Sequence, residues 1–293
     1  MDVTELTTFM AVARSGGITA AAREIHTVQS NVTMRIRTLE DEIGLPLFER
    51  HSRGMSMTEA GERLLPYAER VLSLLAEAKV AARDDLGARG TLHLGAMETT
   101  AAVRLPPLLA EYHKAYPEVK LSLRTGPTAD LLQAVAKREI DGAFVSGPID
   151  HADIVATPAF EERLGLVTPA AIADLAGLRE GAAAGLTVLS FKTGCSYRQR
   201  LEQVMARLGL PAYARLEFGT LDGILGCVAA GVGITLLPRA VVLQAAQRDG
   251  LRWHPIEDGD GIVQTLFIRR RDAYESHAAR HFLGLIAPPT TAL

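Results

Sequence analysis

The sequence predicts a mixed architecture. A mainly helical N-terminal domain of winged helix-turn-helix type leads through a long helix into an α/β domain of two lobes. Three observations support this prediction: three short helical segments followed by two strand-like pieces, then one continuous apolar seam, then alternating strands and helices. They place the domains at residues 1–58, 59–90 and 91–293, with lobes at 91–161 plus 265–293 and at 162–264.

The composition limits the class of protein. With 293 residues, 48% hydrophobic and 22% charged, the chain can bury a sizeable core and form two or more domains. Cys195 and Cys227 make no disulfide framework, and no His/Cys spacing resembles a zinc site, so we expect no metal. Met1–Glu5 begin no secretion signal and no apolar run is long enough to span a bilayer, which predicts a soluble, cytoplasmic protein without a membrane partner.

The segment from Thr27 to Glu40 is the centre of the N-terminal domain. Its apolar residues recur at helical spacing: Val28, Val32, Ile36, Leu39 and Ile43. Thr27 is the predicted N-cap. The other faces carry amide, hydroxyl, thioether and guanidinium groups, on Gln29, Ser30, Asn31, Thr33, Met34, Arg35 and Arg37. Such a helix suits the reading of base edges in a DNA major groove, and the alternative is a solvated surface helix.

The neighbouring segments favour the DNA-reading interpretation. Apolar residues 6–13 form a first helix that Gly16-Gly17 ends, and Thr19 is the predicted cap of a second helix over 20–25. The tight turn at 26–27 then gives the spacing of a helix-turn-helix. Strands at 47–50 and 55–57 flank a turn and form a wing, on which Arg50 and Arg53 would contact phosphates or the minor groove.

The net charge of −3 limits the affinity for nucleic acid, because neutralisation of phosphates dominates that affinity. Residues 26–39 nevertheless contain Arg35 and Arg37 and no acid. We therefore expect modest affinity for each subunit, with a few well-placed cations doubled by dimerisation.

Residues 59–81 predict a dimerisation helix. Thr58 is its expected N-cap, and apolar residues follow at alternating steps of three and four, at Leu64, Tyr67, Val71, Leu74 and Ala78. The alternative for this seam is burial against the helix's own domain. The charged and glycine-punctuated residues 84–90 are typical of a linker.

From Thr91 the chain alternates between strands and helices, which indicates an α/β fold with largely parallel sheets. The candidate strands are 92–96, 119–124, 142–146, 164–168, 187–191, 216–218, 233–236 and 263–268. Two small lobes of this kind leave a cleft for a ligand.

An ordered set of short motifs runs through the chain. The N-terminal part holds Phe9, Val12-Ala13, Gly16-Gly17, Ala21-Ala22, Gln29-Ser30-Asn31-Val32-Thr33, Leu39-Glu40, Gly44-Leu45-Pro46-Leu47-Phe48-Glu49-Arg50 and Thr58-Glu59-Ala60-Gly61. Later come Leu94-Gly95, Leu105-Pro106, Tyr116-Pro117, Gly126-Pro127-Thr128, Ile140-Asp141 and the run from Gly231 to Pro238. By these motifs the whole chain resembles the LysR-type transcriptional regulator family.

This resemblance implies a sequence-specific transcription regulator that binds double-stranded DNA and a small-molecule effector, uses no cofactor and is no enzyme. It implies an effector domain like the periplasmic binding proteins, and a homodimer through the linker helix that assembles into a homotetramer. On the recognition helix it favours Gln29, Thr33 and Arg35 as contacts, with Ser30, Asn31 and Met34 near bases. It assigns Arg37 to a phosphate or the dimer face.

Loops that follow strands and open helices offer backbone N–H groups to an anion. The resemblance places the effector at such loops, at Glu98, Thr99, Thr100, Thr128, Cys195, Ser196, Arg198 and Thr220. The hydroxyls and Arg198 favour a small anion or carboxylate, while Glu98 leaves an amino-acid-like molecule open. The alternative is that the Thr and Ser residues only cap helices.

Three other functions are alternatives to effector-controlled regulation. Cys195 lies at a predicted helix start near Arg198, which would lower its thiol pKa and suit a redox sensor with Cys227. A cytoplasmic solute-binding module would use the two lobes alone, but it does not explain the winged helix. An enzyme with Cys195 as nucleophile lacks an evident general base, and no Gly-x-Ser-x-Gly, Walker or His-Glu-x-x-His motif is present.

Overall fold

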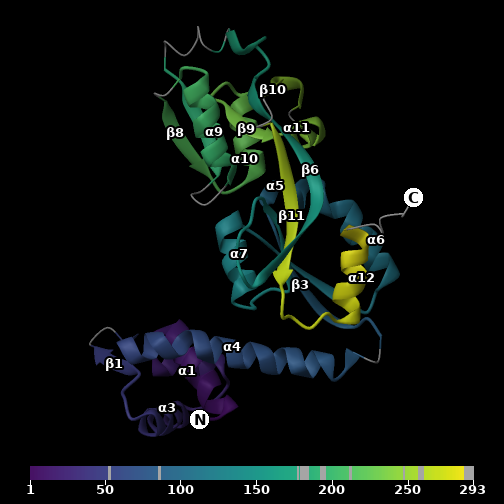
Figure 1. Cartoon of the computed structure of the whole chain (residues 1–293). Helices are drawn as coiled ribbons and strands as arrows, with labels where there is room; N and C mark the ends of the chain where they lie inside the picture. The colour runs from purple at the N-terminus through teal and green to yellow at the C-terminus, as the bar shows by residue number, and fades with distance from the viewer. Residues whose placement is uncertain are drawn as a thin grey trace. The chain divides into compact units, whose positions relative to one another are not determined.

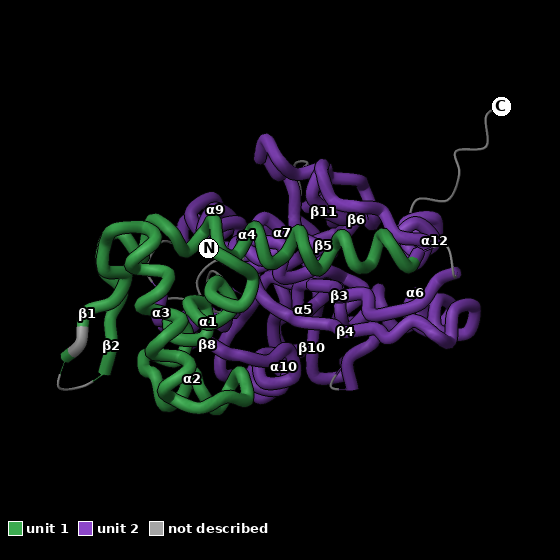
Figure 2. The backbone as a smooth tube through the Cα atoms, turned by 90° about the horizontal axis from the view of Figure 1, so that it is seen from below, with its two compact units in different colours: residues 1–83 green, residues 84–293 purple. Residues whose placement is uncertain are grey.

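The structure is a computed structural model. It describes residues 1–51, 54–84, 87–176, 178, 185–191, 196–210, 213–246, 248–256 and 261–286, with Arg50 described by its backbone alone. The chain divides into two compact units, Met1–Arg83 and Asp84–Leu293 (Figures 1 and 2). No helix of the described part has both the length and the apolar character that a membrane span requires.

Three helices build the first unit: α1 (Val3–Ser15), α2 (Ile18–Glu24) and α3 (Gln29–Ile43). Their apolar stripes meet in one core, where Phe9, Val32 and Leu39 are fully buried. As the sequence predicts, α1 ends at Gly16, which adopts the left-handed conformation with φ of 68°. The three-helix arrangement with short turns is that of a helix-turn-helix.

Two predicted helix caps are wrong. Helix α2 begins one residue before Thr19, with Gly17 at its N-cap, so Thr19 lies inside the helix. The N-cap of α3 is Val28 and not Thr27. The Thr27 hydroxyl instead accepts a hydrogen bond of 3.1 Å from the side-chain amide of Asn31, one turn into α3.

A hairpin forms the predicted wing, with β1 (Phe48–His51) antiparallel to β2 (Gly54–Met57). Its base is fixed to α3, because Glu40 Oε1 accepts the backbone N–H groups of Leu47 and Phe48 at 2.8 and 3.3 Å. Gly54 has φ of 133°, and a Cβ there would lie 2.8 Å from the Gly16 carbonyl oxygen, so this position requires glycine. The predicted wing contact Arg53 lies outside the described residues.

Helix α4 (Glu59–Ala81) is capped by Thr58, whose hydroxyl accepts the Gly61 N–H at 3.1 Å, as predicted. One side of α4 packs on the core of the first unit through Leu64, Leu65 and Leu72. The rest of the seam is exposed, with Tyr67 at 68% and Leu74 at 43% of their full accessible surface. Burial within its own unit therefore does not account for this seam.

The second unit is built on a mixed sheet in the order β10-β6-β11-β5-β3-β4, with β9 beside β6. The strands are β3 (Gly90–Ala96), β4 (Val119–Thr125), β5 (Gly142–Ser146), β6 (Ile154–Pro169), β9 (Thr235–Pro238), β10 (Leu251–Pro255) and β11 (Ile262–Arg270). A separate parallel pair consists of β7 (Thr187–Phe191) and β8 (Ala214–Phe218). Strands β6 and β11 pair antiparallel with each other and with their other neighbours, so the expectation of largely parallel sheets is wrong there.

Helices cover both faces of these strands. They are α5 (Glu98–Val103), α6 (Leu105–Ala115), α7 (Thr128–Ala136), α9 (Ser196–Arg207), α10 (Leu221–Ala229), α11 (Arg239–Gln244), the short 3-10 turn η3 (Arg248–Gly250) and α12 (His277–Ile286). Around β3 and β5, α6 and α12 share one apolar cluster while α7 packs in another (Figure 1). Around β7 and β9, α9 and α10 likewise belong to separate clusters.

These clusters divide the second unit into two halves. The first half contains β3, β4, β5, α5, α6, α7 and α12, and the second contains β7 to β10 with α9, α10 and α11. The long strands β6 and β11 run through both (Figure 1). The two halves are therefore joined by continuous strands, which is an arrangement that can hold a ligand between them.

Candidate functional site

Helix α3 presents the predicted DNA-reading surface of the first unit. Val32, Ile36 and Leu39 hold one side of the helix in the core. The side chains of Gln29, Ser30, Met34 and Arg37 are exposed, and those of Asn31, Thr33 and Arg35 are half-buried. All seven predicted residues thus lie outside the core face, on or beside the exposed face of one helix.

The cations of this surface have no acidic partner among the described residues. Arg35 and Arg37 form no ion pair or hydrogen bond within the part of the chain that the structure describes. By contrast, Arg14 on α1 contacts Glu24 at 2.7 Å and Arg63 on α4 contacts Glu59 at 3.0 Å. Guanidinium groups without internal partners are available to phosphates or base edges.

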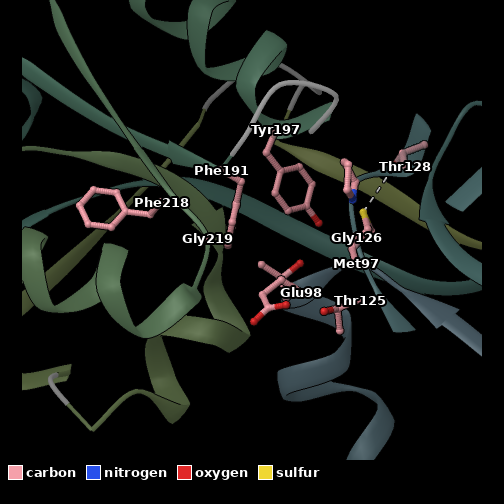
Figure 3. A pocket seen from close by; sticks show the side chains of 11 residues that line it. Met97, Glu98, Thr125, Gly126, Thr128, Phe191, Tyr197, Phe218 and Gly219 are labelled. Carbon is pink, nitrogen blue, oxygen red and sulfur yellow. Dashed lines mark hydrogen bonds between the residues drawn. The ribbon is translucent and has the colours of Figure 1, made fainter. Parts of the chain in front are cut away.

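A cavity of about 190 Å³ lies between the two halves of the second unit. We call it the lobe cavity. Its described lining residues are Met97, Glu98, Thr99, Thr125, Gly126, Pro127, Thr128, Phe191, Tyr197, Phe218 and Gly219 (Figure 3). They follow the carboxyl ends of β3 and β4 in one half and of β7 and β8 in the other, where ligands of α/β sheets bind.

Three predicted effector residues line this cavity: Glu98, Thr99 and Thr128. The Thr128 hydroxyl is already used, because it accepts the Ser146 N–H at 3.2 Å and contacts Met97 Sδ at 3.6 Å. The Thr99 hydroxyl is buried and has no hydrogen-bond partner among the described residues. In Figure 3, Glu98 and Thr125 lie on one side of the cavity and Tyr197 on the other.

Four other predicted effector residues do not line the cavity: Thr100, Ser196, Arg198 and Thr220. Thr100 is buried in α5, and Thr220 caps α10 by accepting the Gly223 N–H at 3.3 Å. Ser196 begins α9 with a buried hydroxyl. Arg198 donates to Glu217 Oε1 at 2.7 Å and lies 3.6 Å from Glu202, so its charge is balanced by protein acids. Cys195 lies outside the described residues.

The second cysteine of the redox hypothesis is in an ordinary position. Cys227 is a free cysteine on α10, partly buried against an apolar cluster that includes Leu225 and Val228. This is how a cysteine behaves as a small core residue. The disulfide hypothesis itself stays a prediction.

Sequence reasoning missed the aromatic walls. Phe191 and Phe218 end the parallel strands β7 and β8 in paired register, and both line the cavity. From the sequence alone, both are apolar residues of predicted strands and would be assigned to the hydrophobic core. A signal was available, since each stands directly before a polar or glycine-containing loop at a strand's carboxyl end.

An ion pair between a partly exposed arginine and a buried glutamate connects the end of α5 to strand β6. Arg104, between α5 and α6, donates to Glu162 on β6 through Nε at 2.7 Å and Nη2 at 3.0 Å. Glu162 is buried, and its hydrogen bonds to Arg104 raise the pKa of that guanidinium. The pair fixes the end of α5 to a strand that runs into both halves.

In the first unit, a winged helix-turn-helix presents arginines that have no partner among the described residues. The second unit is a two-part α/β fold with a cavity between its halves. Together they are the arrangement of a ligand-responsive DNA-binding regulator. Comparisons with known proteins agree. The family model described as bacterial regulatory helix-turn-helix protein, lysR family, matches residues 3–62, and that of the LysR substrate binding domain matches residues 86–288.

Two relatives from Bacillus subtilis (strain 168) are similar over the full chain. The HTH-type transcriptional regulator GltR is 42% identical over 97% of this chain and 95% of its own length. The uncharacterized HTH-type transcriptional regulator YusT is 42% identical over 100% of this chain and 97% of its own. The chain therefore belongs to the LysR family of DNA-binding transcription regulators with an effector-binding domain, and not to a class of enzymes.

Solved structures share the fold. Full-length CbnR, crystallised with its target DNA, matches with a TM-score of 0.71 at 23% identity, over 98% of this chain and 99% of that one. A full-length variant of OxyR from Pseudomonas aeruginosa matches with a TM-score of 0.69 at 22% identity, over 98% of this chain and 93% of that one. At these identities the likeness concerns the fold alone.

Proposed function

We propose that α3 enters the DNA major groove and that Gln29, Thr33 and Arg35 contact bases, with Ser30, Asn31 and Met34 beside them. Arg37 and the wing residues Arg50 and Arg53 would hold phosphates. The observation that carries this proposal is the pair of guanidinium groups, Arg35 and Arg37, without described partners on an otherwise polar and exposed helix. CbnR, which shares this fold, forms a complex with its target DNA, and this also supports the proposal.

The lobe cavity is the proposed effector site. It lies at the carboxyl ends of strands from both halves, and two continuous strands join those halves, so a bound molecule would bias their relative arrangement. Proposed lobe boundaries are those expected from the sequence, at 161/162 and 264/265. The effector would thus alter DNA binding by acting on the effector domain, which follows the linker.

The exposed seam of α4 is the proposed dimer interface. Tyr67, Val71 and Leu74 present large apolar side chains on the side of α4 that does not pack on its own unit. Apolar residues at alternating steps of three and four are what a helix pair buries. Two such subunits would present two recognition helices to one operator, and a homotetramer would pair two dimers.

The DNA contacts are tested by gel-shift titrations on the chain's own upstream region. Gln29→Ala should weaken binding to the operator by roughly 5- to 150-fold, because a paired hydrogen bond to adenine contributes about 1–3 kcal/mol. Binding to unrelated duplex should stay unchanged. Arg37→Ala should weaken binding to both and reduce the salt slope by about 1.

Arg63→Ala is the matched control, since Arg63 is an exposed arginine of the same unit that already pairs with Glu59. It should leave operator binding as it is. Equal loss of operator and non-operator binding in Gln29→Ala would contradict the role of Gln29 as a base contact.

A further inference from the structure

We propose that the effector of the lobe cavity is a primary amine, with an ammonium group that pairs with Glu98 and a compact apolar body that lies against Phe191 and Tyr197. This inference rests on the proposed function of the cavity as the effector site. It names the chemistry that the site selects, and it reverses the preference for a carboxylate that the sequence suggests.

The charge of the cavity wall is the first argument. Among the described lining residues Glu98 is the one with a charged side chain. Its carboxylate is half-buried and makes no hydrogen bond or ion pair with any described residue. A partly desolvated carboxylate without a partner is unfavourable, and a cationic ligand removes that cost.

The wall also contains uncharged polar residues, at Thr99, Thr125, Thr128 and Tyr197. Thr99 is next to Glu98 on α5, lines the cavity, and has a buried hydroxyl oxygen without a hydrogen-bond partner in the described part of the chain. An ammonium group has three N–H donors. It can donate one of these to the Glu98 carboxylate, whereas a quaternary ammonium could donate none; the Thr99 hydroxyl oxygen is buried away from the cavity and is not offered to the ligand.

The aromatic walls are the third argument. Phe191, Tyr197 and Phe218 line the cavity from the second half; in Figure 3 Tyr197 faces Glu98 across it, while the ring of Phe218 points away from Glu98. Aromatic faces attract cations by their quadrupole and bury apolar groups. The volume of about 190 Å³ limits the body to the size of one ring or a branched alkyl group.

Two described groups that the sequence suggests for an anion are engaged elsewhere. Arg198 binds Glu217 and Glu202 and does not line the cavity. The Thr128 hydroxyl bonds Ser146 and Met97. A carboxylate in the cavity would therefore face Glu98, a like charge, without a cation from the described lining.

Glu98 also begins α5, where a carboxylate is favourable by itself. The test therefore measures ligand charge preference rather than stability. We would titrate the full chain by calorimetry and thermal shift with 2-phenylethylamine, 2-phenylethanol and 3-phenylpropanoate, and with the same three head groups on an isobutyl body. Only the amines should raise the melting temperature, with an effect that grows with the logarithm of concentration.

Glu98→Gln keeps the size of the side chain and removes its charge. It should weaken amine binding by roughly 10- to 100-fold, as expected for the loss of a charge-assisted hydrogen bond. Glu98→Lys should transfer the preference to the carboxylates. Glu111→Gln, an exposed acid on α6 of the same half, is the matched control and should bind amines like the unmodified chain.

Two failures are distinguishable. If alcohols or carboxylates bind as well as amines, or if amine binding survives in Glu98→Gln, while Phe191→Ala abolishes binding, the cavity is the effector site but the amine inference is wrong. If no probe binds at about 10 mM, which is ten times a Kd of 1 mM, the amine inference is wrong. If Phe191→Ala leaves all binding intact, both the amine inference and the proposed effector site are wrong.

Discussion

The ion pair between Arg104 and Glu162 should be a main stabilising contact of the second unit. Its two hydrogen bonds, of 2.7 and 3.0 Å, form a bidentate pair. The Glu162 side chain keeps 5% of its accessible surface and that of Arg104 34%. Glu162→Gln is the sharpest perturbation, because glutamine retains the shape but offers one acceptor and places its NH₂ group against an Arg104 donor.

The expected cost follows from this geometry. A hydrogen bond to a charged group contributes about 1.5–3 kcal/mol, and loss of one partner of a fully buried pair costs about 3–5 kcal/mol. Arg104 is one-third exposed and water can solvate it in part, so we expect the free energy of unfolding to fall by about 2–3 kcal/mol. With a urea m-value of about 2 kcal/mol/M, the midpoint should fall by roughly 1–1.5 M.

The assay is urea unfolding followed by the fluorescence of Trp253, the one tryptophan of the chain, which lies on β10 of this unit. Glu118→Gln is the matched control, because Glu118 pairs with Arg89 at 2.7 Å while both side chains are more than half exposed, at 64% and 57%. Exposed pairs contribute about 0–1 kcal/mol, so its midpoint should move by less than roughly 0.5 M. The double variant Arg104→Gln with Glu162→Gln should recover part of the loss, since no uncompensated guanidinium remains. Equal midpoint shifts for Glu162→Gln and Glu118→Gln would refute the reasoning.

Single contacts give three further predictions. Asp84 is buried; burial alone would raise the pKa of its carboxyl, but hydrogen bonds from the His277 N–H, the Tyr274 hydroxyl and the His277 ring hold the pKa below the usual 3.8. The stability that this lowered pKa contributes is present above pH 3.8 and is lost as the pH falls through the folded-state pKa. The unfolding midpoints of the unmodified chain and of Asp84→Asn should therefore converge as the pH is lowered. Burial raises the pKa of the Tyr112 hydroxyl to about 12, so an ultraviolet titration of Tyr112→Phe should lack the last tyrosine step. The same variant loses the hydrogen bond to the Ala278 carbonyl, and its free energy of unfolding should fall by about 1 kcal/mol. Leu74→Glu should dissociate the proposed dimer in sedimentation runs, whereas Ala76→Glu, exposed on the same helix outside the seam, should not; a dimer that tolerates both would remove α4 from the interface.

Much of the N-terminal unit could be predicted because its signals are local. The spacing of Val32, Ile36 and Leu39 identifies the buried side of α3, and the Thr58 cap and the left-handed Gly16 mark helix ends, as the structure confirms. The prediction of Thr27 as a cap fails because Val28, an apolar residue, occupies the N-cap without a side-chain hydrogen bond. A cap of this kind cannot be predicted from the residue types.

The second unit was less predictable because its strands depend on distant partners. Strand β6 begins at Ile154, ten residues before the predicted strand, since its first part pairs with β11 rather than forming a compact apolar run. Strand β10 is absent from the predicted strands: Arg252 and His254 interrupt its apolar pattern, yet Trp253 lies opposite Val167 in the ladder with β6. Pairing across more than 80 residues supplies the stability that local pattern does not indicate.

The charge of the lobe cavity shows the same limit where function is concerned. In the sequence, Arg198 stands near hydroxyl residues at a helix start, which suggests an anion site. The parallel pairing of β7 with β8 places Glu217 within 2.7 Å of that guanidinium, while Glu98 finds no cation among the described residues. The residue types of Glu98, Glu217 and Arg198 do not indicate which of them is paired. Only their contacts in the folded chain decide which charge has no partner among the described residues. The sign of the unbalanced charge, rather than the inventory of polar residues in the loops, is therefore the property from which the ligand class should be inferred.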